Sequence, residues 1–173
     1  MDAFVDFIMI LVPASVVLYA MYLLVRSFIQ KELELKKLEV RGRSIETTLP
    51  IRLQAYERIT LFLERISPQN LLVRLNIGPM TAKEFHQLLL NEIRNEYNHN
   101  VSQQVYMSEK VWELVSNAKE DLIVTINDAS SSMGLESTGL ELSKKVFEKT
   151  LEKDVDPIAH ALSELKKEIQ RTF

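Results

Sequence analysis

The first 43 residues constrain this chain most, because they contain 19 consecutive residues without a charged side chain. The run extends from Phe7 to Val25 and reads FIMILVPASVVLYAMYLLV. At about 1.5 Å per residue, a helix of this length reaches across a hydrocarbon core of about 30 Å. A cleaved signal peptide is the alternative, but Asp2 and Asp6 stand where such a peptide carries basic residues, and no small-residue cleavage site follows. The sequence therefore predicts an uncleaved transmembrane helix.

Basic residues follow this predicted span on one side only. Residues 26–43 hold six Lys and Arg against three Glu, among good helix formers that would continue the helix as a stalk. The positive-inside rule assigns such a flank to the cytoplasm. We therefore expect a single-pass protein of a bacterial inner membrane, with the N-terminus outside. Residues 1–43 would form the transmembrane helix and stalk, and residues 44–173 a cytoplasmic domain.

Apolar residues after the stalk recur every three or four positions, which is the period of an amphipathic helix. The chain of 173 residues has only 4 Gly and 5 Pro, and no stretch alternates between polar and apolar residues. These features predict an all-α fold, with a helical bundle behind the membrane helix. Gly42 is expected to end the stalk, and the following helices are expected over residues 47–66, 68–75, 82–105, 109–129, 140–151 and 157–173.

Local patterns also predict how these helices begin and which side of each is buried. Thr81 and Glu84 have the spacing of a capping box, Ser108 is the expected cap of the helix 109–129, and Pro157 stands at the first position of the last helix. The helix 82–105 has an apolar ridge that ends at Val105. The expected apolar stripe of the helix 109–129 consists of Val111, Leu114, Val115, Ala118, Leu122, Ile126 and Ala129.

Most patterns that carry known catalytic chemistry are missing. The chain has no Cys, which excludes disulfides, cysteine-ligated metals and thiol nucleophiles. It has no glycine-rich phosphate loop, HExxH or GxSxG motif. His86, His99 and His160 stand far apart in the sequence, so we expect no metal site and no cofactor. The net charge of -3 argues against a general basic face for nucleic acid, although it permits a local patch.

The segment EIRNEYNHN contains one group of residues that could take part in catalysis. Arg94 is followed by Asn95 and, five positions after the arginine, by His99. This spacing on a helix resembles the motif of HEPN domains, many of which are metal-independent ribonucleases. The resemblance implies that His99 would act as a general acid or base and Arg94 would hold a phosphate.

Chance and helix geometry both weigh against this motif. Nine Arg and three His give roughly 0.5 chance matches to such spacings. Five residues also separate the two side chains by about 140° around a straight helix, so a second protomer or a bend would have to unite them. The alternative is structural: Arg94 pairs with Glu96 or another surface acid, and His99 is simply solvated.

Two longer segments resemble a known family. They are LPIRLQAYERITLFLERISPQNLLVRL (residues 49–75) and EIRNEYNHNVSQQVYMSEKVWELV (residues 92–115). They are similar to small single-span membrane proteins of Bacteroidota with an anchor, a stalk and a helical domain. Within that group the chain resembles the membrane accessory protein encoded beside the RNA-guided RNase of type VI-B CRISPR systems, which also has a divergent HEPN-like motif.

That resemblance implies a function in antiphage defence. The protein would form a ring-shaped homo-oligomer, such as an octamer, whose membrane helices surround a pore that depolarises the infected cell. Its partners would be other copies of itself, the lipid bilayer, and the RNA-guided effector RNase or its RNA. Arg94, Asn95 and His99 would bind RNA or support assembly, without nuclease activity. Two other hypotheses stay open: a membrane-tethered HEPN ribonuclease, and a housekeeping membrane scaffold.

Overall fold

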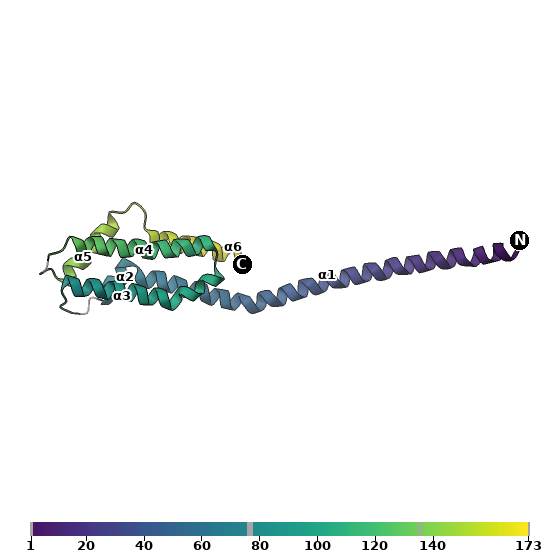
Figure 1. Cartoon of the computed structure of the whole chain (residues 1–173), viewed down its shortest axis with the longest axis horizontal. Helices are drawn as coiled ribbons and strands as arrows, with labels where there is room; N and C mark the ends of the chain where they lie inside the picture. Colours follow the sequence, from purple (N-terminus) through teal and green to yellow (C-terminus); the bar gives the residue numbers. More distant parts are fainter. Residues whose placement is uncertain (1, 76–77, 135, 173) are drawn as a thin grey trace. The chain divides into compact units, whose positions relative to one another are not determined.

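The computed structural model describes residues 2–75, 78–134 and 136–172, with the side chains of residues 2–6, 10, 41–45 and 172 excepted. Within these ranges the regular structure is helical, and no strand forms beyond one isolated bridge (Figure 1). This confirms the predicted all-α fold. The chain divides into two compact units, Met1–Pro50 and Ile51–Phe173. In order, the elements are α1 (Asp2–Ile66), α2 (Pro68–Leu75), α3 (Ala82–Asn100), the 3₁₀ helix η1 (Val101–Tyr106), α4 (Glu109–Ser131), α5 (Gly139–Leu151) and α6 (Pro157–Thr172).

The first unit consists of the N-terminal part of α1. The stretch Phe7–Val40 is long and apolar enough to cross a membrane, and its apolar part has no buried residue. Every described side chain between residues 7 and 25 is exposed. Because so much apolar surface is unfavourable in water, this segment needs lipid or another apolar partner.

The predicted break at Gly42 is wrong, because α1 is continuous from Asp2 to Ile66. A single glycine inside a helix costs only about 1 kcal/mol relative to alanine. A helix normally ends where its final carbonyl groups find other partners, often through a glycine with positive φ, and none of the described glycines has a positive φ. The stalk therefore continues into the helix that had been predicted to begin at Thr47 or Thr48.

The second unit has one hydrophobic core. Helix α4 packs against α3, α5 and α6, and α2 packs against α3 and α5. The predicted apolar stripe of α4 is buried from Val111 to Ala129, except that Leu114 is half-buried. The C-terminal part of α1 contributes six buried side chains to the unit: Ala55, Tyr56, Ile59, Phe62, Leu63 and Ile66.

Side-chain caps begin several of these helices. The predicted capping box of Thr81 and Glu84 is formed, and the predicted cap Ser108 accepts a hydrogen bond from the Val111 N–H. A second capping box, Thr138 with Glu141, begins α5 and was not predicted. Caps of this kind satisfy N–H groups that the first helical turn leaves without partners. The beginnings of α3 and α5 are also joined, because the Ala82 N–H donates to Ser137 O and the Gly139 N–H donates to Met80 O, both at 2.8 Å.

At this junction Gly139 lies directly against Phe85. A Cβ atom at Gly139 would stand 3.1 Å from the Phe85 Cβ and 3.2 Å from its Cγ, and Phe85 is buried. We therefore expect Gly139→Val to lower the free energy of unfolding by about 1–3 kcal/mol through overpacking. Denaturant titration measures this loss. Gly78→Val is the control, because no atom lies within 4 Å of a Cβ there; an equal loss in both variants would contradict the steric explanation.

The predicted helix over residues 82–105 is too long. Helix α3 ends at Asn100, and the chain continues as the 3₁₀ helix η1. The buried Asn100 side chain donates to the Glu96 carbonyl at 2.8 Å, and such side-chain bonds compete with the backbone of a helix. Val105, which had been placed on the core ridge, is 74% exposed.

Candidate functional site

Helix α3 carries the three residues singled out by the sequence. Its apolar face is buried through Phe85, Leu89 and Ile93, which directs other side chains outward. Arg94, Asn95 and His99 are all exposed. His99 occupies the last turn of the helix, where the partial negative charge of the helix end favours a cation.

His99 lies at a hollow of about 350 Å³ between α1 and α3. Arg94 is not part of its lining, so one copy of the chain does not bring Arg94 and His99 to one ligand. The imidazole instead shares the hollow with two guanidinium groups of α1. The lining residues are Arg58, Leu61, Phe62, Arg65, Glu96, His99 and Asn100.

Two of the lining residues, Arg65 and Glu96, belong to an ion-pair network. Arg65 binds Glu96 at 2.5 Å and approaches Glu92 to 3.9 Å, and Arg74 binds Glu92 at 2.5 Å. The alternative that Arg94 pairs with Glu96 is therefore wrong: Arg65, from another helix, is the partner of this acid. Among the described residues, the Arg94 side chain has no ion-pair or hydrogen-bond partner.

The charges around the hollow favour an anion. Arg58 and Arg65 contribute two positive charges against the single negative charge of Glu96. Arg58 has no ion-pair partner among the described residues, so its guanidinium is available to a ligand. Guanidinium groups bind phosphate and carboxylate groups with two parallel hydrogen bonds. The hollow can therefore hold a phosphate or carboxylate group.

Arg58 and Arg65 are site residues that the sequence did not predict. One signal was present, since the two arginines are seven residues apart and so lie on the same side of a helix. The side of α1 that meets α3, however, depends on how the helices pack.

A second polar cluster joins α1, α4 and α6. The Tyr56 hydroxyl donates to Glu168 Oε1 at 2.9 Å, and Arg52 Nη2 donates to the Tyr56 hydroxyl at 3.0 Å. Glu168 also accepts from the Ser108 N–H at 2.9 Å and from the Ser108 hydroxyl. Burial and the bond to Glu168 raise the pKa of Tyr56 above 10.0. Burial favours a higher pKa for Glu168 as well, but the hydrogen bonds from Ser108 prevail and keep this pKa below 4.5.

Because the pKa of Glu168 is lowered in the folded state, its contribution to stability is present above pH 4.5 and is lost as the pH falls through the folded-state value. We expect Glu168→Gln to lower the free energy of unfolding by about 1–3 kcal/mol at pH 7. The reason is that the variant replaces the hydrogen bonds to a charged carboxylate with weaker ones to a neutral amide. The difference from the unchanged protein should shrink as the pH falls below 4.5. Urea titrations at several pH values test this. Glu113→Gln, at an exposed position of α4, is the control, and a loss that does not depend on pH would contradict the assignment.

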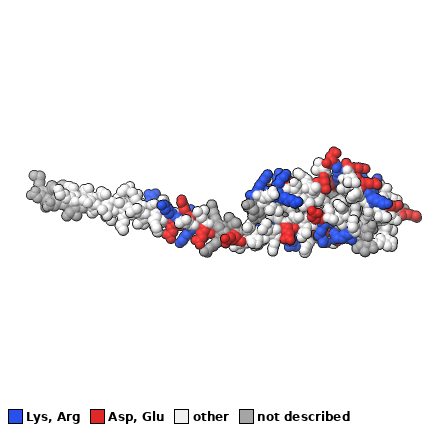
Figure 2. Space-filling model, turned by 180° about the vertical axis from the view of Figure 1, so that it is seen from behind, with Lys and Arg blue, Asp and Glu red and all other residues white. Residues whose placement is uncertain are grey.

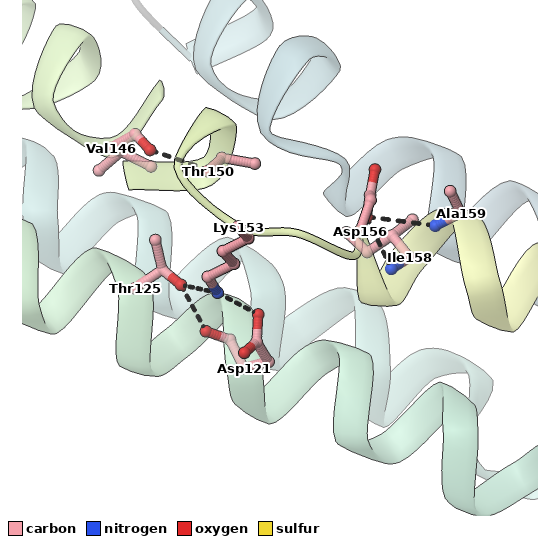
Figure 3. A network of polar contacts seen from close by, with 8 residues as sticks. All are labelled: Asp121, Thr125, Val146, Thr150, Lys153, Asp156, Ile158 and Ala159. Atoms are coloured by element: carbon pink, nitrogen blue, oxygen red, sulfur yellow. Dashed lines mark hydrogen bonds and ion pairs between the residues drawn. The ribbon is translucent and has the colours of Figure 1, made fainter. Parts of the chain in front are cut away.

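A third cluster attaches the segment after α5 to α4 (Figure 3). Lys153 Nζ donates to Asp121 Oδ2, and to Thr125 Oγ1 at 2.6 Å. Nearby, Asp156 Oδ1 accepts from the backbone N–H groups of Ile158 at 2.8 Å and Ala159 at 3.2 Å, which caps α6. These contacts satisfy polar groups where two helices meet, and we assign them a structural role.

The other two histidines stand apart from the hollow. His86 Nε2 lies 2.8 Å from Asn127 Oδ1, and the exposed His160 lies in the first turn of α6. In the described parts of the chain, no three His, Asp or Glu side chains are grouped so that they could hold a metal ion.

Comparison with known proteins gives a match to a family model. No curated protein and no solved structure matches the chain. The model of a family of unknown function, DUF7935, matches residues 2–172, which include the apolar N-terminal helix and the helical domain together. The chain therefore belongs to the family of unknown function DUF7935.

Proposed function

We propose that this protein is an integral, single-pass membrane protein with its N-terminus outside and its helical domain in the cytoplasm. The observation that carries the proposal is the uncharged, exposed helix Phe7–Val25. Figure 2 agrees, since the described residues of α1 between Phe7 and Val25 are white, whereas the stalk that follows carries both blue and red. The excess of basic residues over residues 26–43 supports the orientation.

We further propose that several copies of the protein assemble in the bacterial inner membrane and make it permeable, as an accessory of CRISPR RNA-guided antiphage defence. The resemblance of residues 49–75 and 92–115 to the accessory protein of type VI-B systems supports this role. An uncharged span cannot conduct ions alone, because it offers no polar path through the bilayer. Several copies of the helix must therefore surround any pore.

In this proposal His99 binds RNA or supports the assembly of several copies of the chain. His99 faces Arg58 and Arg65 across the hollow, an arrangement suited to hold an anionic group such as an RNA phosphate. Arg94 lies outside the hollow and is open to a partner. Substituting His99 or Arg94 with Ala should weaken defence while the protein stays in the membrane.

The proposal is tested in bacteria that carry the RNA-guided RNase, with a potential-sensitive dye during phage infection. We expect depolarisation and stronger protection when the full chain is present, and neither with His99→Ala. The purified protein should form particles of several copies in detergent. Monomers in detergent, together with an unchanged membrane potential during infection, would overturn the proposal of a pore.

One specific observation favours the ribonuclease hypothesis: the imidazole of His99 and the guanidinium groups of Arg58 and Arg65 line the same hollow. It predicts RNA products with cyclic phosphate ends, formed by the folded oligomer and lost in His99→Ala. Intact RNA after long incubation would eliminate this hypothesis and leave the binding role. If substitution of both Arg94 and His99 left defence unchanged, the scaffold hypothesis would be favoured.

A further inference from the structure

The stalk of α1 exposes large apolar side chains in a segment that is rich in charge. Lys31, Lys36 and Lys37 are in this segment, which places it in water beyond the membrane. Phe28 is nevertheless 69% exposed and Leu35 67% exposed. Apolar side chains in such a setting are stabilised when another surface covers them.

The spacing of the exposed apolar side chains along α1 indicates what kind of surface covers them. Met21, Leu24, Phe28, Leu35 and Leu38 follow one another at intervals of three, four, seven and three residues. On a continuous helix, positions that alternate by three and four form a single stripe, which is the a/d seam of a coiled coil. All five side chains are 62–72% exposed, so their own unit leaves the seam uncovered. The seam begins inside the predicted span and continues through the charged stalk.

We propose that this seam is the surface through which copies of the chain associate, as a parallel coiled coil that extends from the membrane into the stalk. The proposal deepens the proposed function and rests on its membrane anchor. Copies anchored by the same span have the same direction and the same depth in the bilayer. Each residue of the seam therefore lies at the same level as its counterpart in the neighbouring copy, and a seven-residue repeat is the pattern that such association of helices requires.

The charges beside the seam fit a second copy. Lys31 occupies the one seam position between Phe28 and Leu35. In a parallel coiled coil a residue at this position packs beside the position that follows it in the neighbouring helix, where this chain carries Glu32. The ammonium group of one copy thus meets a carboxylate of the next. A single charged residue in a seam also specifies the register.

Cysteine cross-linking tests the seam, because the chain has no cysteine of its own. Leu35→Cys and Leu38→Cys place a thiol on the seam of the full-length protein. Leu33→Cys and Val40→Cys are matched controls, since these residues are 54% and 63% exposed but stand about 160° and 140° around the helix from Leu35. In isolated membranes treated with a mild copper oxidant, we expect the seam variants to form disulfide-linked dimers roughly tenfold faster than the controls.

The outcomes separate this inference from the proposed function. Equal rates at the four positions, or no dimer at any of them, would overturn the seam even if the protein resisted alkaline extraction from the membrane. Release by alkaline extraction would instead overturn the anchor. As a second measurement, Leu35→Glu with Leu38→Glu should reduce the particle size in detergent, and Leu33→Glu with Val40→Glu should not. An identical size for both pairs would also reject the seam.

Discussion

Replacing Val16 and Leu18 with Arg is expected to prevent the protein from integrating into the membrane. Both residues are near the middle of the uncharged run and are 63% and 68% exposed. Each Arg at the centre of a membrane helix costs about 2.5–3.5 kcal/mol on insertion scales, so the pair costs about 5–7 kcal/mol. Alkaline carbonate extraction, with the pellet and supernatant compared by immunoblot, measures the integrated fraction.

The control for this experiment places the same two charges in the stalk. Leu33 and Val40 are also exposed apolar residues of α1, but charged residues surround them. Leu33→Arg with Val40→Arg should leave the protein in the membrane. If the Val16 and Leu18 variant stayed in the pellet, the assignment of Phe7–Val25 as the span would be wrong.

Leu63→Ala is expected to destabilise the helical domain by about 2–5 kcal/mol, because it leaves a cavity in the core. Leu63 is fully buried, at the centre of the contribution of α1 to the hydrophobic core. Urea titration of the full chain in detergent measures the loss. The fluorescence of Trp112 provides the signal, since it is the single tryptophan and stacks on Tyr97 at 5.7 Å between ring centroids.

Leu61→Ala is the matched control, because the same group is removed two residues away. Leu61 is 53% exposed and borders the hollow beside His99. Surface substitutions of this kind change stability by about 0.5 kcal/mol or less. Equal losses at Leu61 and Leu63 would mean that α1 does not present the described face to the core.

Patterns that act over a few residues predicted much of the fold correctly. The capping box of Thr81 and Glu84, the Ser108 cap and the proline that begins α6 are all present. Each is a local interaction between a side chain and the backbone of the next turn. The end of α3 was predicted incorrectly because the apolar ridge does not mark it: the regular helix stops at Asn100, whose side chain donates to the Glu96 carbonyl.

The candidate site depended on contacts between helices. The spacing of five residues suggested a joint site for Arg94 and His99. In the structure, His99 instead lines a hollow with two arginines of α1. Likewise Glu96 pairs with Arg65, 31 residues earlier, and not with its neighbour Arg94. Nothing in a local motif specifies which side of one helix faces another.

By itself the sequence determined the apolar N-terminal helix, the helical class and most helix starts, because hydrophobic period and capping are properties of neighbouring residues. Only the tertiary structure decided which charged side chains meet. Packing against α3 places Arg58 and Arg65 beside His99, and the contact of α6 with α4 places Glu168 on Ser108. The physical reason is that burial of apolar faces sets the orientation of each helix, and polar partners follow from that orientation.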